Sequence, residues 1–274
     1  MSEDVAARRG IDITKPNVAR VYDYFIGGKD HFAVDRMAAE QALTIIPDAR
    51  EAGRACRSFL RRAVHHMAAD AGVRQFLDIG SGLPTDTNVH QVAQDVDPAC
   101  RVVYVDNDPM VLVHGRALLA NSPNTTVIEA DLRSPEAILE HPVVRDRLNF
   151  AEPIGLLLLS VLHHLHDDAD PGGIAATLRA ALPSGSYLAI IHFWDPGEEH
   201  PLISEKVHEA ERVFNETLGT GRWRSRSELE AYFGDFEMLE PGLVPVEEWR
   251  PDTEPPVEKY VSYYTMLGGV ARKP

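Results

Sequence analysis

The stretch QFLDIGSGLPTDTNVH, residues 75–90, decides the fold. It places an apolar strand, a glycine turn and a polar segment that can begin a helix directly after one another. Gly80 and Gly82 let the backbone turn tightly and approach a ligand that a Cβ atom would push away. Strand–turn–helix units of this kind hold nucleotide cofactors, so the stretch predicts a nucleotide site.

The residues that follow repeat the pattern of short apolar strands and helix-compatible segments. After residues 76–79, the runs that read as strands are residues 101–106, 125–131, 154–161, 186–193, 237–246 and 260–269. Continuous apolar runs are typical of strands buried on both faces. The sequence therefore predicts an α/β fold with a doubly wound, mostly parallel seven-stranded sheet covered by helices.

The first seventy residues predict helices instead. Apolar side chains recur at helical spacing in residues 17–28, where Gly27-Gly28 would end the helix. A second helix is expected over residues 32–46 and a third over residues 48–72. We expect an N-terminal helical cap over residues 1–72 and a core over residues 73–274, which together form one compact domain.

The composition excludes several classes of protein. Lys and Arg number 27 and Asp and Glu number 42, so the formal net charge is −15, which disfavours an extended nucleic-acid partner. Cys56 and Cys100 form no CxxC motif, and the N-terminus has no apolar signal core. The longest apolar run, residues 154–162, is too short to cross a bilayer. We expect a soluble, cytoplasmic protein and leave its oligomeric state open.

The acidic residues around the glycine turn distinguish between two cofactors. Asp106 ends the second strand, where a carboxylate accepts the ribose hydroxyls of a nucleotide. A dinucleotide site needs a third glycine where this chain has Thr85, and Asp78 in the strand end would repel a pyrophosphate. S-adenosylmethionine carries a sulfonium and an ammonium and no phosphate. The residues therefore favour S-adenosylmethionine over NAD, with a ligand-free glycine turn as the other alternative.

The third strand ends in Ala130-Asp131-Leu132. A carboxylate there can take the adenine amino group while the leucine packs on the ring. Asp131 taken alone could equally cap the following helix. With Asp78 and Asp106 also at strand ends, a role in binding is the better explanation.

Four motifs together resemble those of class I S-adenosylmethionine-dependent methyltransferases, which have a Rossmann-like fold. They are LDIGSGLPT (77–85), VVYVDNDPMVL (102–112), EADLRSP (129–135) and LLLLSVLHHL (156–165). More narrowly, PNVARVYDYFIGGKDHFAVDR (16–36) with DIGSGLPT and VVYVDNDP resembles the S-adenosyl methyltransferase family first catalogued as a domain of unknown function. The resemblance covers nearly the whole chain.

The resemblance implies which residues hold the methyl donor. The glycine turn, Gly80, Ser81 and Gly82, is expected to hold the amino-acid part, and the end of the second strand, Asp106 and Asn107, is expected to hold the ribose. The end of the third strand, Asp131 and Leu132, is expected to hold the adenine, and the end of the fourth strand, Ser160 and Val161, is expected to face the sulfur side.

HHLHDDAD, residues 163–170, follows the fourth strand. Histidine and aspartate are metal ligands, but this spacing matches no standard zinc pattern, and we expect no metal. His163 is the candidate catalytic base because the strand end faces the expected acceptor cavity. Methyl transfer to an already nucleophilic atom needs only alignment, so a structural histidine is the alternative.

The segment VYDYFIGGKDHF, residues 21–32, is unusually patterned for a packing helix. N-terminal helices of this fold class commonly cover the cofactor, so Arg20 and Tyr24 are expected at the donor, where Arg20 or Lys29 could meet its carboxylate. A helical cap with solvated charges is the alternative.

The sequence thus predicts a methyltransferase that uses S-adenosylmethionine and acts on a small-molecule acceptor by in-line transfer. A non-catalytic S-adenosylmethionine sensor is the alternative from another class, and an NAD-dependent oxidoreductase is a weaker one.

Overall fold

A computed structural model describes residues 11–85, 87–119, 122–254 and 259–274. One eight-stranded sheet forms its centre, with the strand order β3-β2-β1-β4-β5-β8-β6 and with β7 paired to β8. The strands are β1 Gln75–Ile79, β2 Arg101–Asp106, β3 Thr125–Glu129, β4 Gly155–Leu159, β5 Tyr187–Phe193, β6 Glu237–Met238, β7 Val244–Pro245 and β8 Met266–Arg272.

Strands β1 to β5 are parallel, and β6, β7 and β8 form the antiparallel edge of the sheet. β1 pairs with β2 on one side and β4 on the other, and all these ladders run in parallel. β8 is antiparallel to β5 and lies inside the sheet, although it is the last strand in sequence order. From β1 the chain adds β2 and β3 on one side and then crosses to β4 and β5 on the other side. The direction in which strands are added thus reverses between β1 and β4, and the carboxyl ends of these two strands border a crevice.

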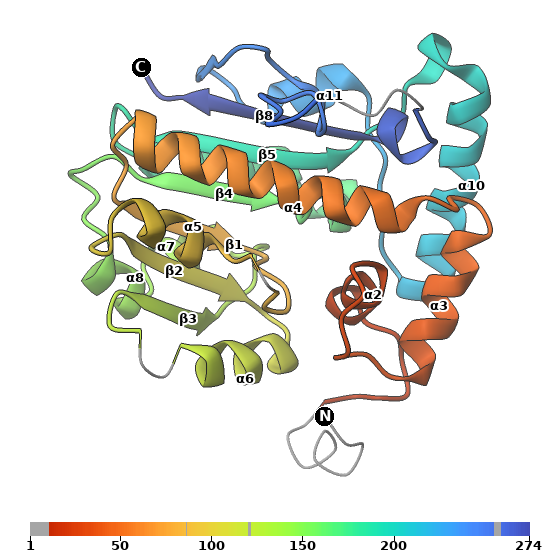
Figure 1. The fold of residues 1–274 in the computed structure, drawn as a ribbon, viewed down its shortest axis with the longest axis horizontal. Helices are drawn as coiled ribbons and strands as arrows, with labels where there is room; N and C mark the ends of the chain where they lie inside the picture. Colours follow the sequence, from red (N-terminus) through yellow and green to blue (C-terminus); the bar gives the residue numbers. More distant parts are fainter. Residues whose placement is uncertain (1–10, 86, 120–121, 255–258) are drawn as a thin grey trace.

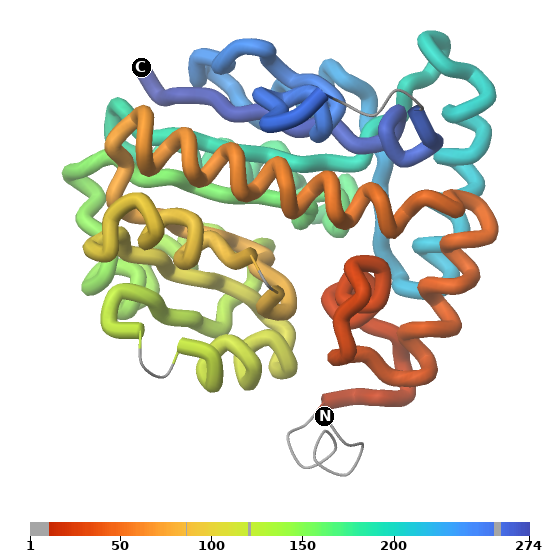
Figure 2. The backbone as a smooth tube through the Cα atoms, in the orientation of Figure 1, coloured from red at the N-terminus to blue at the C-terminus, as the bar shows by residue number. Residues whose placement is uncertain are grey.

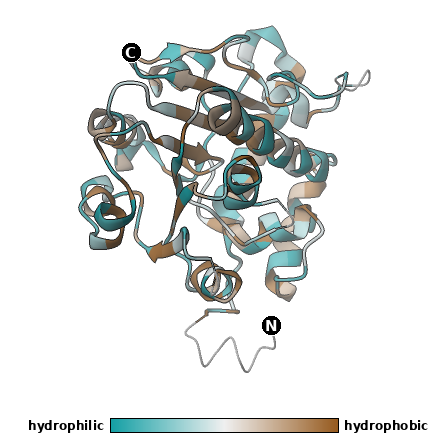
Figure 3. Cartoon of the chain, turned by 60° about the vertical axis from the view of Figure 1, so that its left-hand side comes forward, coloured by the Kyte–Doolittle hydropathy of each residue, from teal (hydrophilic) through white to brown (hydrophobic). Residues whose placement is uncertain are grey.

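Helices cover both faces of the sheet. α4 Ala49–His65 and α5 Val89–Val96 pack against side chains such as Phe76 and Leu157 on one face. The helices whose residues belong to the core on the other face are α7 Pro135–Leu139, α8 Pro142–Arg147, α9 Pro171–Ala181 and α11 Arg226–Ala231. Figure 3 shows the hydrophobic residues gathered on the central strands and on the helix sides that face them. The doubly wound α/β fold is thereby confirmed.

A helical group lies beyond the carboxyl ends of the parallel strands (Figure 1). α2 Val18–Phe25, α3 Ala33–Leu43 and α10 Pro201–Leu218 share one buried cluster, to which Val21, Val207 and Trp223 belong. α4 continues from this group across the sheet, as the tube in Figure 2 traces. α6 Pro109–Leu118 lies beside β3 at the other edge.

The elements differ from the sequence expectations mainly at the C-terminal edge. The expected strand over residues 237–246 forms as two short strands, β6 and β7, because Pro241 and Gly242 interrupt it and Gly242 has a φ of 91°. The sheet therefore has eight strands rather than seven. The helix expected over residues 48–72 ends at His65 and continues as a π-helical turn over His66–Asp70. None of the helices within the described ranges is long and apolar enough to cross a membrane.

Candidate functional site

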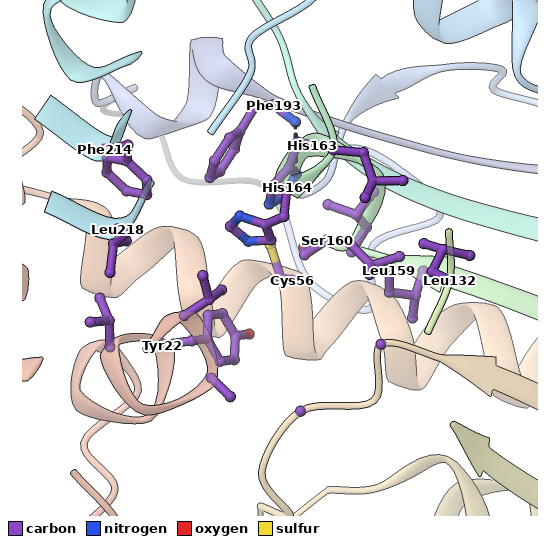
Figure 4. A pocket seen from close by; sticks show the side chains of 18 of the residues that line it. Tyr22, Cys56, Leu132, Leu159, Ser160, His163, His164, Phe193, Phe214 and Leu218 are labelled. Carbon is purple, nitrogen blue, oxygen red and sulfur yellow. Dashed lines mark hydrogen bonds between the residues drawn. The ribbon is translucent and has the colours of Figure 1, made fainter. Parts of the chain in front are cut away.

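A cavity of about 770 Å³ lies between the carboxyl ends of the parallel strands and the helical group. Its volume lies in the range of small-molecule sites. The residues that line it are spread along the sequence between Asn17 and Met266, so segments from nearly the whole length of the chain contribute. Figure 4 shows its interior, with Leu132 and Leu159 on the strand side and Tyr22, Phe214 and Leu218 on the helical side.

The glycine turn after β1 forms one wall of this cavity. Gly80 has a φ of 74°, and a Cβ atom there would lie 2.3 Å from Cγ2 of Val161. Gly82 has a φ of 66° and no heavy atom near its Cβ position. Any other residue at Gly80 would both strain the backbone and clash with Val161, so the turn depends on glycine for its close approach to the cavity.

Asp106 at the end of β2 holds the turn in place. Its Oδ2 accepts a hydrogen bond from the Gly82 backbone N–H at 2.9 Å, and its Oδ1 accepts one from the Asp108 N–H at 3.0 Å. Burial raises the pKa of Asp106, and these two backbone donors oppose that rise. Each carboxylate oxygen can accept a further bond, so Asp106 can also receive hydroxyl groups from a ligand in the cavity.

Asp131 and Leu132 follow β3 and also line the cavity. Asp131 accepts bonds from the backbone N–H and the guanidinium of Arg133, and these bonds are the main cause that lowers its pKa. Leu132 is buried against the sheet core. The pair presents a carboxylate beside an apolar side chain at the end of β3.

Ser160 and Val161 connect β4 to the 3₁₀ turn Leu162–His164. Ser160 has a φ of 60°, which is the left-handed region that costs a non-glycine residue energy. Its backbone N–H bonds to the Ile191 carbonyl of β5 at 3.0 Å, which holds this conformation. Strained residues of this kind gather at functional sites, and Ser160 lines the cavity.

Asp78 lies beneath the turn and does not line the cavity. It is buried within β1, and this burial raises its pKa to about 7, while Arg57 nearby opposes the rise. Arg57 does line the cavity, from α4. Its Nη2 bonds to the Thr85 hydroxyl and to the Thr87 carbonyl, and its buried Nε has no hydrogen-bond partner among the described residues.

The structure brings neither Arg20 nor Tyr24 to the described lining of the cavity. The Arg20 guanidinium is buried and bonds to Asp35 at 2.9 Å and to the carbonyls of Asp12 and Lys15. Because a buried charge is stable only when it is paired, Arg20 is held between α2 and α3 and is not free to meet a ligand. The Tyr24 hydroxyl instead bonds to Glu40 near the surface.

The two histidines that follow β4 have different surroundings. The His163 ring is 1 % exposed, stacks on Phe193 with ring centroids 3.6 Å apart, and accepts a hydrogen bond from the Phe193 N–H at 3.3 Å through Nδ1. His164 is half-buried, and its ring points into the cavity (Figure 4). Its Nδ1 is buried without a hydrogen-bond partner among the described residues. Both line the cavity, but His164 offers the more accessible ring.

Aromatic rings build a wall of the cavity from the ends of β4 and β5 to the helical group. Phe193 lies between the rings of His163 and Trp223 in a parallel stack, with 4.2 Å between the Phe193 and Trp223 centroids. Phe214 meets both Phe193 and Trp223 edge to face. Stacked and edge-to-face rings stabilise each other, so this wall is rigid.

The cavity thus has two ends of different composition. We call the residues at the strand ends the strand-end half: Gly80, Ser81, Gly82, Asp106, Asn107, Asp131, Leu132, Ser160 and Val161. We call the residues near the helical group the cap half: Tyr22, Phe25, Cys56, His163, His164, Phe193, Phe214, Leu218 and Trp223. Within the described ranges, no three His, Cys, Asp or Glu side chains gather as metal ligands would.

Sequence reasoning did not identify Arg57 as a site residue. It lies on a helix before the glycine turn, and only the packing of α4 on the sheet brings it to the cavity. The basic run RACRSFLRR, residues 54–62, was a weak signal, because two of its arginines face inward and only Arg57 reaches the cavity, whereas Arg62 is buried on the carbonyls of Val246 and Trp249. His164 was also missed, since sequence cannot tell which of two adjacent histidines in a tight turn points inward.

A family model described as S-adenosyl methyltransferase matches residues 4–274. Among solved structures, a Thermobifida fusca protein assigned as a methyltransferase is 45 % identical, with a TM-score of 0.90 over 96 % of this chain and 97 % of that one. A DUF574 family protein from Streptomyces avermitilis is 40 % identical, with a TM-score of 0.88 over 96 % of this chain and 99 % of that one.

A more distant likeness extends to the wider fold class. An S-adenosylmethionine-dependent methyltransferase from Anabaena variabilis is 15 % identical, with a TM-score of 0.50 over 95 % of this chain and 97 % of that one. At this identity the likeness shows the fold alone. No curated protein matches the chain.

Proposed function

The chain belongs to the S-adenosyl methyltransferase family, and from that premise we propose that it transfers the methyl group of S-adenosylmethionine to a small-molecule acceptor. The observation that carries the proposal is the continuity of the cavity. One space joins the strand-end half, with its carboxylates and glycine turn, to the apolar cap half. A donor and an acceptor can therefore meet without water between them.

The residues of the strand-end half fit S-adenosylmethionine. We assign the ribose to Asp106 and Asn107, the adenine to Asp131 and Leu132, the amino-acid part to Gly80, Ser81 and Gly82, and the sulfur side to Ser160 and Val161. Several observations support this fit: the absence of space for a Cβ at Gly80, the free acceptor capacity of Asp106, and the carboxylate beside an apolar side chain after β3. The bound donor supplies an electrophilic methyl group on a sulfonium.

We assign the donor's carboxylate to Arg57 rather than to Arg20. Arg57 lines the cavity beside the glycine turn and has a buried Nε without a partner among the described residues, whereas Arg20 is committed to Asp35. A guanidinium binds a carboxylate through paired hydrogen bonds. Asp78, buried near Arg57, adds a negative charge close to the donor's ammonium when it is ionised.

Arg57→Met tests this assignment. The affinity for S-adenosylhomocysteine is expected to fall about 10- to 100-fold, because a hydrogen bond to a charged group contributes about 1.5–3 kcal/mol. Arg54→Met is the matched control, since Arg54 lies on the exposed side of the same helix and pairs with Glu51. Equal affinities of the two variants in calorimetry would contradict the assignment.

The chain's own contribution to the reaction is alignment. The strand ends fix the donor, and the aromatic wall fixes the acceptor opposite it, so that the nucleophile, the methyl carbon and the sulfur lie in line. Holding two reactants in this way replaces a bimolecular encounter with an intramolecular step.

The experiment that tests the function is parallel calorimetric titration with S-adenosylmethionine, S-adenosylhomocysteine and NADH. Binding of the first two ligands and not of NADH is expected. Radiolabelled donor incubated with acceptor libraries then tests transfer. Binding of NADH alone would overturn the proposal, and donor binding without transfer to any acceptor would favour a sensor.

A further inference from the structure

The cap half of the cavity carries no ionised side chain among its described residues. The charged lining residues are Asp106, Asp108, Asp131 and Arg133 near the strand ends, Asp168 on an exposed turn, and Arg57 of α4 at the border between the two halves, bonded to Thr85 and Thr87. The titratable groups of the cap half are held in their neutral forms. Burial raises the pKa of the Cys56 thiol to about 12 and raises that of Tyr22, and it lowers the pKa of His164 to about 4 and that of His163 further still.

This neutrality restricts what can enter. With the donor's carboxylate on Arg57, a charged acceptor would lose its water on entering the cap half and find no free counter-charge there, which is strongly unfavourable. An uncharged molecule loses far less hydration free energy on entering the cap half. The acceptor that this half can hold is therefore neutral at physiological pH.

The shape of the wall restricts the acceptor further. The parallel stack of His163, Phe193 and Trp223 and the perpendicular ring of Phe214 form a flat aromatic surface. Tyr22 lies across the cavity from Phe193 and Phe214, with the His164 ring between the two sides (Figure 4). Flat aromatic molecules gain most from such surroundings, because they can stack on or meet these rings edge to face.

His164 supplies the polar group of the cap half. Its Nδ1 is buried and has no partner in the described part of the chain, and buried polar atoms of this kind are normally satisfied by a ligand or by water. Its ring is neutral, so one of its nitrogens can accept a hydrogen bond. It lies in the turn directly after Ser160, next to the place assigned to the donor's sulfur.

From this geometry we infer that the acceptor is an uncharged aromatic compound with a hydroxyl group, which donates a hydrogen bond to His164 and is methylated on that oxygen. The inference rests on the proposed function. In the step, the oxygen–methyl bond forms as the sulfur–methyl bond breaks, and the hydroxyl proton passes to the imidazole of His164. The sulfonium becomes a neutral thioether as the imidazole takes the proton, so the total charge is unchanged in this step, and His164, whose pKa burial lowers to about 4, then releases the proton to water.

Binding to the protein saturated with S-adenosylhomocysteine tests the acceptor class. The probes are phenol, naphthol and hydroxycoumarin, with benzoate and naphthoate as the charged counterparts of the first two. At least one phenol is expected to bind, and each carboxylate at least about tenfold more weakly than its counterpart. Carboxylates that bind as tightly as the phenols would overturn the inference.

Turnover of the bound phenol with labelled donor tests His164. His164→Asn keeps a polar atom near the position of Nδ1 but cannot take a proton, so kcat is expected to fall at least about 100-fold with unchanged affinity for S-adenosylhomocysteine. His65→Asn, at an exposed position of α4, is the matched control and should not change kcat. Normal turnover by His164→Asn would overturn the role of His164.

The binding data also separate this inference from the proposed function. Failure to bind S-adenosylhomocysteine would defeat the proposed function itself. Tight binding of S-adenosylhomocysteine, with no phenol bound or methylated, would defeat only the inference about the acceptor.

Discussion

The strand-end half and the cap half of the cavity are built by different means. In the strand-end half, backbone groups and carboxylates at consecutive strand ends create the site, and Asp106 holds the glycine turn through the Gly82 N–H. In the cap half, rings from separate elements meet, and Trp223 lies beside Phe193 because the segment after α10 bonds to the sheet end through the Arg224 N–H and the Phe193 carbonyl. The strand-end half thus depends mainly on backbone geometry, and the cap half depends on the packing of side chains. We therefore expect substitutions in the two halves to affect different properties of the protein.

The largest effect is expected in the cap half, on stability. Trp223 is 5 % exposed and packs on two phenylalanine rings, so Trp223→Ala should lower the free energy of unfolding by about 3–5 kcal/mol. Urea denaturation measures this change. The folded fraction should bind S-adenosylhomocysteine within about twofold of the wild-type affinity, because a cavity in the cap half leaves no contact of Asp106 changed. A comparable loss of donor affinity would show that the two halves are coupled, and Trp223→Phe, which keeps a ring in the stack, serves as the milder control.

The next effect is expected in the strand-end half, on donor affinity. Asp106→Ala removes the proposed ribose acceptor and the anchor of the glycine turn, so the affinity should fall about 100- to 1000-fold. Calorimetry with S-adenosylhomocysteine measures this loss, and Asp95→Ala at an exposed position of α5 is the control. If Asp106→Ala bound the donor normally, the assignment of the strand-end half would fail.

A smaller effect concerns pH. The folded-state pKa of Asp78 is raised to about 7 from an ordinary value of 3.8, so between these values the folded protein binds more protons than the unfolded chain. Stability contributed by protonated Asp78 is therefore present at low pH and lost as the pH rises towards 7.

Asp78→Asn removes this dependence. The wild type loses stability as the pH rises from 5 to 8, and the variant does not. The free energy of unfolding of the variant minus that of the wild type should therefore be about 2–3 kcal/mol larger at pH 8 than at pH 5. Urea denaturation at both pH values measures the difference, with Asp95→Asn at an exposed position of α5 as the control. A constant difference between Asp78→Asn and wild type would refute the raised pKa.

The smallest effect is expected at Arg133, whose side chain is 63 % exposed. Exposed ion pairs contribute about 0–1 kcal/mol, so Arg133→Ala should change donor affinity by no more than about threefold. The expected direction is tighter binding, because Asp131 is released from Arg133 and can accept the adenine amino group. Asp131→Ala should weaken donor binding. An increase in donor affinity for that variant would contradict the assignment of Asp131 to the adenine.

The comparison of the two halves also explains what the sequence could predict. The carboxyl ends of neighbouring parallel strands meet at one edge of the sheet, so Asp106, Asp131 and Ser160 could be placed together from strand ends alone. The sixth expected strand, residues 237–246, could not be resolved into β6 and β7, because its interruption at Pro241-Gly242 leaves only two-residue pairings with β8.

The contributions of the N-terminal helices were far less predictable. Arg20 has the chemistry expected of a donor ligand, but Asp35, fifteen residues later, buries and pairs it. Arg57 reaches the cavity because α4 packs on the sheet, which no local pattern in the sequence records. The choice between His163 and His164 depends on the direction of each ring in one 3₁₀ turn.

The position of β8 has a consequence for chains that lack it. This strand lies between β5 and the short strands β6 and β7, and Met266 at its start lines the cavity together with the preceding Thr265. Without β8, the edge of β5 would be unpaired and the cavity would lose part of its wall. An unpaired strand edge can pair with another chain, so a protein truncated before β8 would be prone to aggregation.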